Sequence, residues 1–97
     1  MIDNEFYEDV AYELNENFDI GIPKFGDNKF FVSNYNVDSD HIYDKNGVLH
    51  RCKTLEEIYE MKDYFPSKID AVKWILQNKD IFASSLGERK EEFMERF

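Results

Sequence analysis

Hydrophobic side chains recur at helical spacing near the start of the chain. They stand three or four positions apart and form one stripe, which consists of Phe6, Tyr7, Val10, Ala11, Leu14 and Phe18. This period predicts an amphipathic helix over residues 3–18. We expect Asp3 to cap its N-terminus, and Gly21 and Pro23 to end the helix and open a loop.

The apolar pattern changes after residue 28 to short runs that are typical of strands. Residues 29–35 are rich in Phe, Val and Tyr and predict a strand, and residues 37–40 predict a turn. Residues 41–44 and 48–53 flank Asn46-Gly47, and Asn-Gly between strand-like segments favours a hairpin. We therefore expect a three-stranded antiparallel sheet.

Helix signals return in the second part of the chain. Thr54 and Glu57 form a capping box for a helix that we expect to reach about Tyr64. Pro66 ends that segment, and Ser67 is expected to cap the next helix. The apolar stripe of this next helix consists of Ile69, Val72, Ile75 and Leu76, and Trp74 lies near its edge.

The last residues predict one further helical segment with a break. We expect Asp80 to cap it and Gly87 to interrupt it before a final piece over residues 88–97. The 97 residues therefore predict a single α+β domain. It would contain an N-terminal amphipathic helix, a small three-stranded antiparallel sheet and then two to three helices.

Charge is distributed unevenly along this pattern. Residues 1–44 hold 11 acidic and 2 basic side chains, whereas residues 45–97 hold 10 of each, so the formal net charge of −9 arises in the first part. The acidic surface disfavours nucleic acids and membranes as direct partners, because nucleic acids and anionic membranes are polyanions. Because the chain has one cysteine and shows neither a secretory signal nor a long apolar run, we expect a cytoplasmic protein.

The polar face of the first helix is the strongest candidate for a binding surface. The side chains opposite the apolar stripe are Glu5, Glu8, Asp9, Tyr12, Glu13 and Glu16, and Asp19 follows the helix. Residues 1–23 contain no lysine or arginine. Carboxylates on successive turns are comparable to phosphates in charge and spacing, so this face suits the arginine and lysine side chains of a basic protein. The alternative interpretation is a solvated face without a partner.

Asp38, Asp40 and Asp44 form a second acidic cluster, which we expect to extend the negative surface. The cluster does not fit an EF-hand, because Gly47 at the sixth position would place Lys53 at the twelfth, where a glutamate is required. Hydrogen bonds within a turn explain Asp38 and Asp40 more simply, and the extension of the negative surface is a secondary role.

His50 and Cys52 stand two residues apart on one predicted strand and therefore share a face. With His41 they supply at most three metal ligands, whereas structural zinc requires four in recognisable pairs. Cys52 and a histidine also offer a nucleophile and a base, but a cysteine in a strand more often packs in the core. We predict no metal, no cofactor and no catalytic residue, and hence no enzymatic activity.

Four apolar residues near the C-terminus follow a short heptad-like spacing, namely Phe82, Leu86, Phe93 and Phe97. This C-terminal seam indicates either a helix packed on the protein's own sheet or a surface for a partner. A homodimer through residues 82–97 is one form of the second alternative.

These features together predict a small acidic inhibitor. We expect it to bind the basic, nucleic-acid-handling surface of a nuclease or another DNA- or RNA-binding protein by phosphate mimicry, with Tyr12 or Tyr35 as an aromatic anchor. A phage anti-CRISPR or anti-restriction protein in the host cytoplasm would act in this way. The alternatives are an immunity protein or antitoxin for a toxin nuclease, an adaptor subunit that uses the C-terminal seam, and a small enzyme with acidic residues around His41 or His50.

Overall fold

The structure, a computed structural model, describes residues 4–37 and 40–97 of the chain. The helices and strands in chain order are α1 (Asn4–Phe18), β1 (Ile20–Gly21), β2 (Ser33–Asn34), β3 (His41–Tyr43), β4 (Leu49–Arg51), α2 (Leu55–Glu60), α3 (Lys68–Gln77), α4 (Lys79–Ala83), the 3-10 helix η1 (Gly87–Arg89) and α5 (Lys90–Arg96). The predicted α+β class with an N-terminal helix is confirmed. No helix within these two ranges has the length and apolar character that crossing a membrane requires.

The sheet has four antiparallel strands in the order β1-β2-β3-β4, so the prediction of three strands was wrong. In the register, Ile20 lies opposite Asn34, and Ile42 lies between Ser33 and His50. The strand that the sequence did not predict is β1, which has two residues and is too short to show a periodic pattern. The predicted 29–35 strand shrinks to β2, because its earlier part forms isolated bridges to other loops instead.

The first helix ends at Phe18, as the predicted range of residues 3–18 has it, and Gly21 and Pro23 lie beyond its end. Asp19 ends it by adopting a left-handed conformation, with φ of 55°. Asp tolerates this conformation better than most residues other than glycine, and it turns the chain directly into β1. Gly21 lies in that strand, where a Cβ would overlap the ring of Tyr35. The predicted cap Asp3 lies outside the described residues, as does part of the predicted 37–40 turn.

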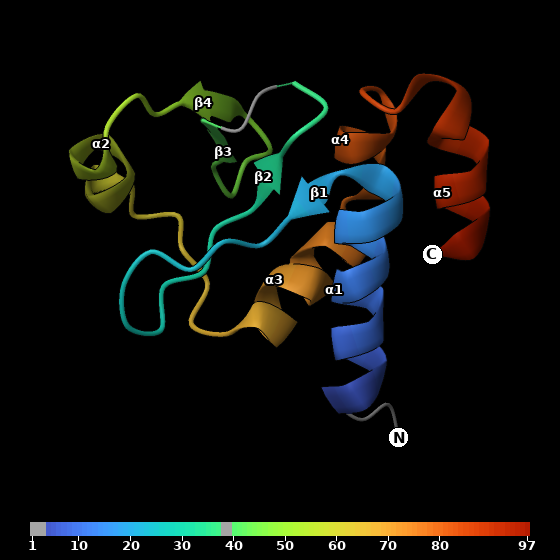
Figure 1. Ribbon diagram of the computed structural model, residues 1–97, viewed down its shortest axis with the longest axis horizontal. Helices are drawn as coiled ribbons and strands as arrows, with labels where there is room; N and C mark the ends of the chain where they lie inside the picture. The colour runs from blue at the N-terminus through green and yellow to red at the C-terminus, as the bar shows by residue number, and fades with distance from the viewer. Residues whose placement is uncertain (1–3, 38–39) are drawn as a thin grey trace.

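The main hydrophobic core lies between α1, α3 and the two C-terminal α-helices. Val10, Leu14 and Phe18 are buried as predicted, and the rings of Phe18 and Phe93 meet edge to face with centroids 5.3 Å apart. Phe6 is 45 % exposed, so its assignment to the buried stripe was wrong. The first turns of α1 extend beyond the helices that cover its later turns, which explains this exposure (Figure 1).

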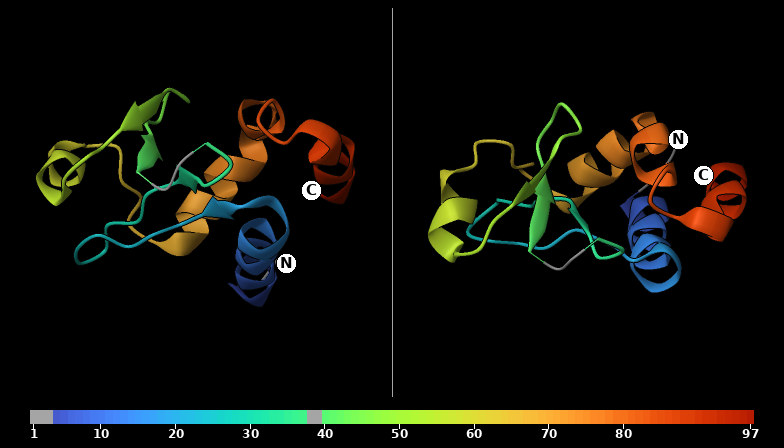
Figure 2. Two further views of the ribbon diagram at one scale, coloured as in Figure 1. Left: turned by 45° about the horizontal axis from the view of Figure 1, so that its top comes forward. Right: turned by 90° about the horizontal axis from the view of Figure 1, so that it is seen from above.

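A second, smaller hydrophobic cluster joins α2 to the β3–β4 hairpin. It consists of Phe31, Ile42, Cys52 and Ile58, with Phe25, Met61 and Tyr64 packed against it. Figures 1 and 2 show α2 and the hairpin on one side of the molecule and α1, α3, α4 and α5 on the other, with β1 and β2 between them. The α1 helix therefore lies in a different part of the molecule from the hairpin.

Local capping signals account for where α2 and α3 begin. Thr54 accepts a hydrogen bond from the main-chain N–H of Glu57 at 3.2 Å, and Ser67 accepts one from Asp70 at 3.1 Å, so both predicted caps are confirmed. The α2 helix ends at Glu60, about one turn before the predicted end. The chain is already extended at the next residue, on its way to pair Phe65 with Phe30.

The C-terminal segment differs from prediction at its first cap. Asn78, rather than Asp80, occupies the N-cap position of α4, and Asp80 lies inside the first turn. Asn78 is also the C-cap of α3, and its side chain donates a hydrogen bond to the carbonyl oxygen of Trp74 in that helix at 2.8 Å. Gly87 interrupts the helical path as predicted, with φ of 57°.

Candidate functional site

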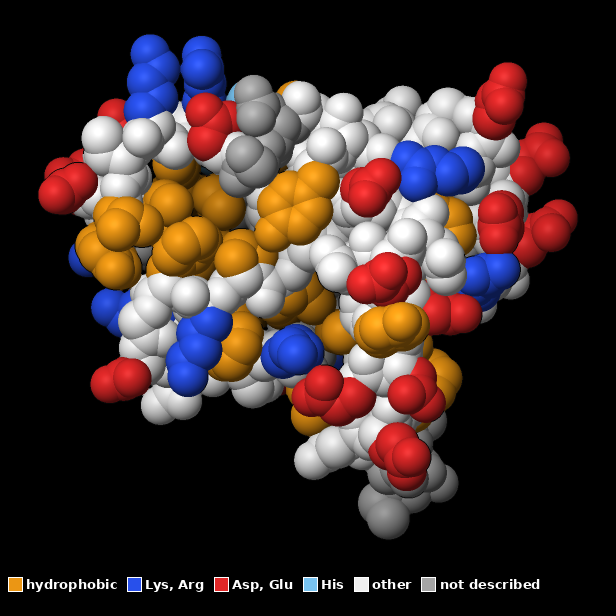
Figure 3. All heavy atoms as spheres, in the orientation of Figure 1, with side chains coloured by type: hydrophobic (Ala, Val, Ile, Leu, Met, Phe, Trp, Pro, Cys, Tyr) orange, Lys and Arg blue, Asp and Glu red, His pale blue; other side chains and the backbone are white. Residues whose placement is uncertain are grey.

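The outward face of α1 carries a row of exposed carboxylates. Glu5, Asp9 and Glu16, here called the acidic ridge, are exposed on one face of the helix and point away from the core. In the part of the chain that the structure describes, none of the three forms an ion pair with a lysine or arginine. Figure 3 shows acidic side chains gathered over this helix. The ridge therefore presents negative charge that neighbouring side chains do not neutralise.

The two edges of the same face have basic neighbours that the sequence pattern did not predict. On one edge, Lys68 Nζ of α3 lies 3.5 Å from Glu8 Oε2; on the other, Arg96 Nη1 of α5 lies 3.4 Å from Glu13 Oε1. The lysine and arginine that residues 1–23 lack are therefore supplied at the edges of the face by α3 and α5. All four side chains are substantially exposed, so each pair contributes at most about 1 kcal/mol to stability.

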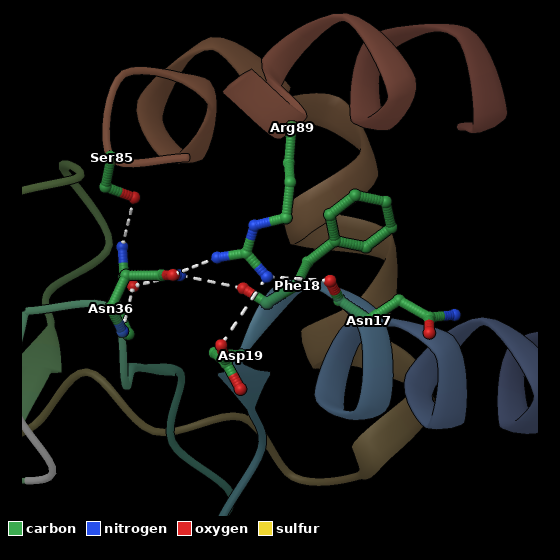
Figure 4. Close-up of polar contacts among 7 residues, drawn as sticks. Asn17, Phe18, Asp19, Asn36, Ser85 and Arg89 are labelled. Atoms are coloured by element: carbon green, nitrogen blue, oxygen red, sulfur yellow. Dashed lines mark hydrogen bonds and ion pairs between the residues drawn. The ribbon is translucent and has the colours of Figure 1, made fainter. Parts of the chain in front are cut away.

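A polar network fixes the C-terminal end of α1 (Figure 4). Arg89 Nη1 donates to the carbonyl oxygen of Asn17 at 2.8 Å and lies 3.5 Å from Asp19 Oδ2. Asn36 Nδ2 donates to the carbonyl oxygen of Phe18 at 2.7 Å, and Arg89 Nη2 donates to Asn36 Oδ1. These bonds satisfy carbonyl groups of the last helical turn and place a positive charge at the negative end of the helix dipole.

Asn34 extends this network into the core. Its Nδ2 donates to the hydroxyl oxygens of Tyr43 at 2.9 Å and Ser85 at 2.7 Å, while its Oδ1 accepts from the main-chain N–H of Asn36 at 3.0 Å. Burial raises the pKa of Tyr43 above its ordinary value, and the hydrogen bond from Asn34 acts in the opposite direction. The fully buried Asn34 side chain therefore joins β3 to the segment that follows α4, and reaches the end of α1 only through Asn36.

A pocket of about 390 Å³ lies beside the acidic ridge, between α1 and the segments that contain β1 and the end of β2. Tyr12 and Tyr35, 67 % and 40 % exposed, both line it. Glu8 and Lys68 also line it, and the remaining lining residues are Ala11, Asn15, Gly21, Ile22 and Pro23. The sequence suggested Tyr12 and Tyr35 only as alternative anchors, and the structure brings both to this tyrosine pocket.

The acidic residues of the hairpin have local partners. Asp40 Oδ2 accepts from Arg51 Nε at 3.0 Å, and this bond lowers the pKa of Asp40 below its ordinary value. Asp44 contacts His50 Nε2 at 2.7 Å and also accepts from two main-chain N–H groups of the turn, and the bond with His50 is the main reason for its lowered pKa. Asp40 and Asp44 lie on the hairpin side of the molecule, away from α1, so they do not extend its acidic face (Figure 1). Asp38 lies outside the described residues.

Cys52 and the two histidines do not form a shared site in the described part of the chain. Cys52 is 6 % exposed and its Sγ lies 3.5 Å from Met61 Sδ, and burial raises the pKa of its thiol. His41 Nδ1 lies 3.0 Å from Asp40, and His50 is engaged with Asp44. Within residues 4–37 and 40–97, no three His, Cys, Asp or Glu side chains gather closely enough to hold a metal ion.

The C-terminal seam lies largely inside the protein. Phe82, Leu86 and Phe93 are buried in the main core, and Phe97 packs against it. The ring of Phe82 meets that of Tyr43 with centroids 4.8 Å apart. These side chains therefore contribute to the protein's own fold.

Comparison of the chain with protein-family models, with curated proteins and with solved structures found no match.

Proposed function

We propose that this protein binds the basic, nucleic-acid-handling surface of a nuclease or another DNA- or RNA-binding protein and blocks it. The observation that carries this proposal is the acidic ridge: Glu5, Asp9 and Glu16 are exposed on one helix face without an ion-pair partner among the described residues. A face that serves only solubility usually mixes both signs of charge. A row of carboxylates without intervening cations suits a partner whose surface is rich in arginine and lysine.

Spacing supports phosphate mimicry. Glu5 and Asp9 are four residues apart and therefore separated by about 6 Å along the helix axis, which is comparable to the distance between successive phosphates on one strand. Glu16 lies about 10 Å further along the same face, roughly two turns from Asp9. Arginine binds carboxylates and phosphates with the same bidentate geometry, so a side chain selected for phosphate can accept a ridge carboxylate. The partner would then be inhibited by competition, because the ridge and the nucleic acid occupy the same cations.

The rigid attachment of α1 also supports this role. Its apolar side packs on α3 and the C-terminal helices, and Arg89 and Asn36 bind its last carbonyl groups. A ridge on a fixed helix loses little conformational freedom when it binds, so more of the electrostatic attraction is retained as affinity. The negative field of the first 44 residues would in addition speed the encounter with a basic partner.

Two biological settings fit this activity, a phage protein that disables a host defence nuclease and an immunity protein that neutralises a toxin nuclease. The same surface would serve both, and the partner decides between them. An adaptor that uses the C-terminal seam has less support, because Phe82, Leu86 and Phe93 are already buried within the chain.

The proposal is tested by capture of partners on three immobilised baits from a bacterial lysate cleared of nucleic acid. The baits are the wild-type protein, a ridge variant (Glu5→Gln, Asp9→Asn, Glu16→Gln) and a control variant (Glu56→Gln, Glu60→Gln, Glu91→Gln) with the same net charge as the ridge variant. The control glutamates are exposed and lie on α2 and α5. We expect nucleic-acid-binding proteins on the wild type and the control, eluted by duplex DNA, and their loss from the ridge variant. Equal retention of these proteins on all three baits would contradict the proposal.

A further inference from the structure

We infer that the tyrosine pocket receives an arginine side chain of the partner and prefers arginine to lysine. This inference rests on the proposed function, since it specifies which basic side chain the partner inserts beside the acidic ridge. The pocket of about 390 Å³ lies within the roughly 300–1,000 Å³ range of ligand sites, and it is large enough for a guanidinium group with its aliphatic stem.

The chemistry of the lining matches a guanidinium group. Tyr12 and Tyr35 supply two aromatic rings from different segments, and Glu8 supplies a carboxylate. A planar guanidinium stacks on aromatic rings and can bind a carboxylate through two N–H groups, whereas a lysine ammonium is compact and strongly hydrated. The pocket therefore favours arginine through its rings, while the Glu8 carboxylate can accept a hydrogen bond from either cation.

The backbone prepares one wall of the pocket before a ligand arrives. The main-chain N–H of Tyr35 donates to the carbonyl oxygen of Asp19 at 2.8 Å, which ties this residue to the end of α1. The Tyr35 ring lies directly against Gly21, where the missing side chain leaves the space that the ring occupies. Because the ring is placed by packing and by a main-chain bond, little ordering is required when a side chain enters.

Lys68 is a built-in competitor for the same carboxylate. Its Nζ lies 3.5 Å from Glu8 Oε2, and Lys68 itself lines the pocket. Both side chains are more than one third exposed, so their interaction is weak and readily exchanged for a bond to an incoming guanidinium. Removal of the Lys68 ammonium should therefore strengthen arginine binding.

The inference is tested by NMR titration of the isotopically labelled full chain with N-acetyl-arginine amide. N-acetyl-lysine amide and N-acetyl-citrulline amide serve as matched probes for charge and for shape. We expect saturable shifts of the main-chain amides of Gly21, Ile22 and Tyr35. The arginine probe should bind about two- to fivefold more tightly than the lysine probe, the ratio expected for one exposed cation–π contact, and the neutral citrulline probe should bind more weakly than either. Equal affinity for the arginine and lysine probes, or shifts spread along α1 without saturation, would overturn the inference.

Variants separate the pocket from general electrostatics. Tyr12→Leu should abolish the preference for arginine and Tyr12→Phe should keep it. Lys68→Met should raise the affinity for the arginine probe, whereas Lys73→Met, which removes the same charge from the same helix outside the pocket lining, should not. An equal gain from both lysine variants would also overturn the inference.

The outcomes for the pocket and for the proposed function remain distinguishable. The function is judged by the ridge variant on the capture baits, whereas the pocket is judged by titration of Tyr12 and Lys68 variants that retain Glu5, Asp9 and Glu16. Ridge-dependent capture together with an absence of arginine preference would reject the pocket and retain the function. A preference for the arginine probe without ridge-dependent capture would reject the proposed function. It would also reject the claim that the pocket receives an arginine of that partner.

Discussion

Arg89 donates a hydrogen bond to the main-chain carbonyl oxygen of Asn17 at 2.8 Å, across 72 residues of sequence. The bond joins the C-terminal segment to the last turn of α1, where the guanidinium also meets Asp19 and Asn36. The orientation of the acidic ridge therefore depends on a cation from the part of the chain whose formal charge is zero.

Replacement of Arg89 should loosen the end of α1. We expect Arg89→Met to lower the free energy of unfolding by about 1–2 kcal/mol, because it removes hydrogen bonds to a carbonyl group and an amide together with a favourable charge at the helix C-terminus. Urea unfolding measures the change. Lys90→Met removes the same charge from an exposed neighbouring position and should change stability little, so equal losses in the two variants would contradict this role.

Asn34 should be among the polar residues on which stability depends most. Asn34→Leu removes donors from the Tyr43 and Ser85 hydroxyl groups in a buried site, and we expect it to lower the free energy of unfolding by about 2 kcal/mol. Tyr43→Phe removes one partner of the same network. If the network acts as a unit, the double variant will lose less than the sum of the two single losses, whereas full additivity would argue against it.

The contact between Gly21 and Tyr35 should tolerate no added side chain. Gly21→Ala places a Cβ where the Tyr35 ring lies, and we expect a loss of about 1–3 kcal/mol in the free energy of unfolding. The loss should shrink when Tyr35 is replaced by alanine, because the obstructing ring is then absent. A double-mutant cycle by urea unfolding measures this coupling, and its absence would show that the ring is not held against Gly21.

The acidic ridge should reduce stability most at its C-terminal end. Glu16 lies in the last turn of α1 three residues after Glu13, so it faces both the negative end of the helix dipole and a like charge. We expect Glu16→Gln to raise the free energy of unfolding by about 0.3–0.5 kcal/mol at low salt. Glu5→Gln, in the first turn, should produce no such gain, and the difference between the two should diminish as salt is added.

Acid should weaken the hairpin once the pH is low enough to protonate Asp40 and Asp44. The pKa values of Asp40 and Asp44 are lowered below 3.8 in the folded protein, chiefly by bonds from Arg51 and His50 respectively. Their contribution to stability is therefore complete above about the unfolded value of 3.8 and is lost as the pH falls through the folded pKa values. Carboxyl carbon shifts in an NMR titration should report these low pKa values.

Each pKa should respond to its own partner, which provides the control for this titration. Arg51→Met should raise the pKa of Asp40 toward 3.8 and leave that of Asp44 low. His50→Ala should raise the pKa of Asp44 and leave that of Asp40 low. If either variant moved both pKa values equally, the cause would be general charge and not the specific hydrogen bonds.

Local signals in the sequence identified the elements whose causes are local. The spacing of Val10, Leu14 and Phe18 predicted α1 and its buried face, and Thr54 and Ser67 marked the starts of α2 and α3. Each of these features depends on residues within one or two helical turns, so residue type and spacing along the chain are sufficient to predict it. The Asn46-Gly47 turn belongs to the same group, since a tight hairpin depends on the residues in the turn itself.

The acidic face of α1 was also determined by the sequence, because the helical period and the absence of lysine and arginine in residues 1–23 place carboxylates together. Tertiary structure decided which of these carboxylates stay unpaired. Lys68 lies 60 residues from its partner Glu8, and Arg96 lies 83 residues from Glu13. The meeting of Tyr12 with Tyr35 at one pocket and the short strand β1 likewise arise only when distant segments pack. A sequence pattern records the neighbours along the chain, whereas ion pairs and pockets depend on neighbours in space.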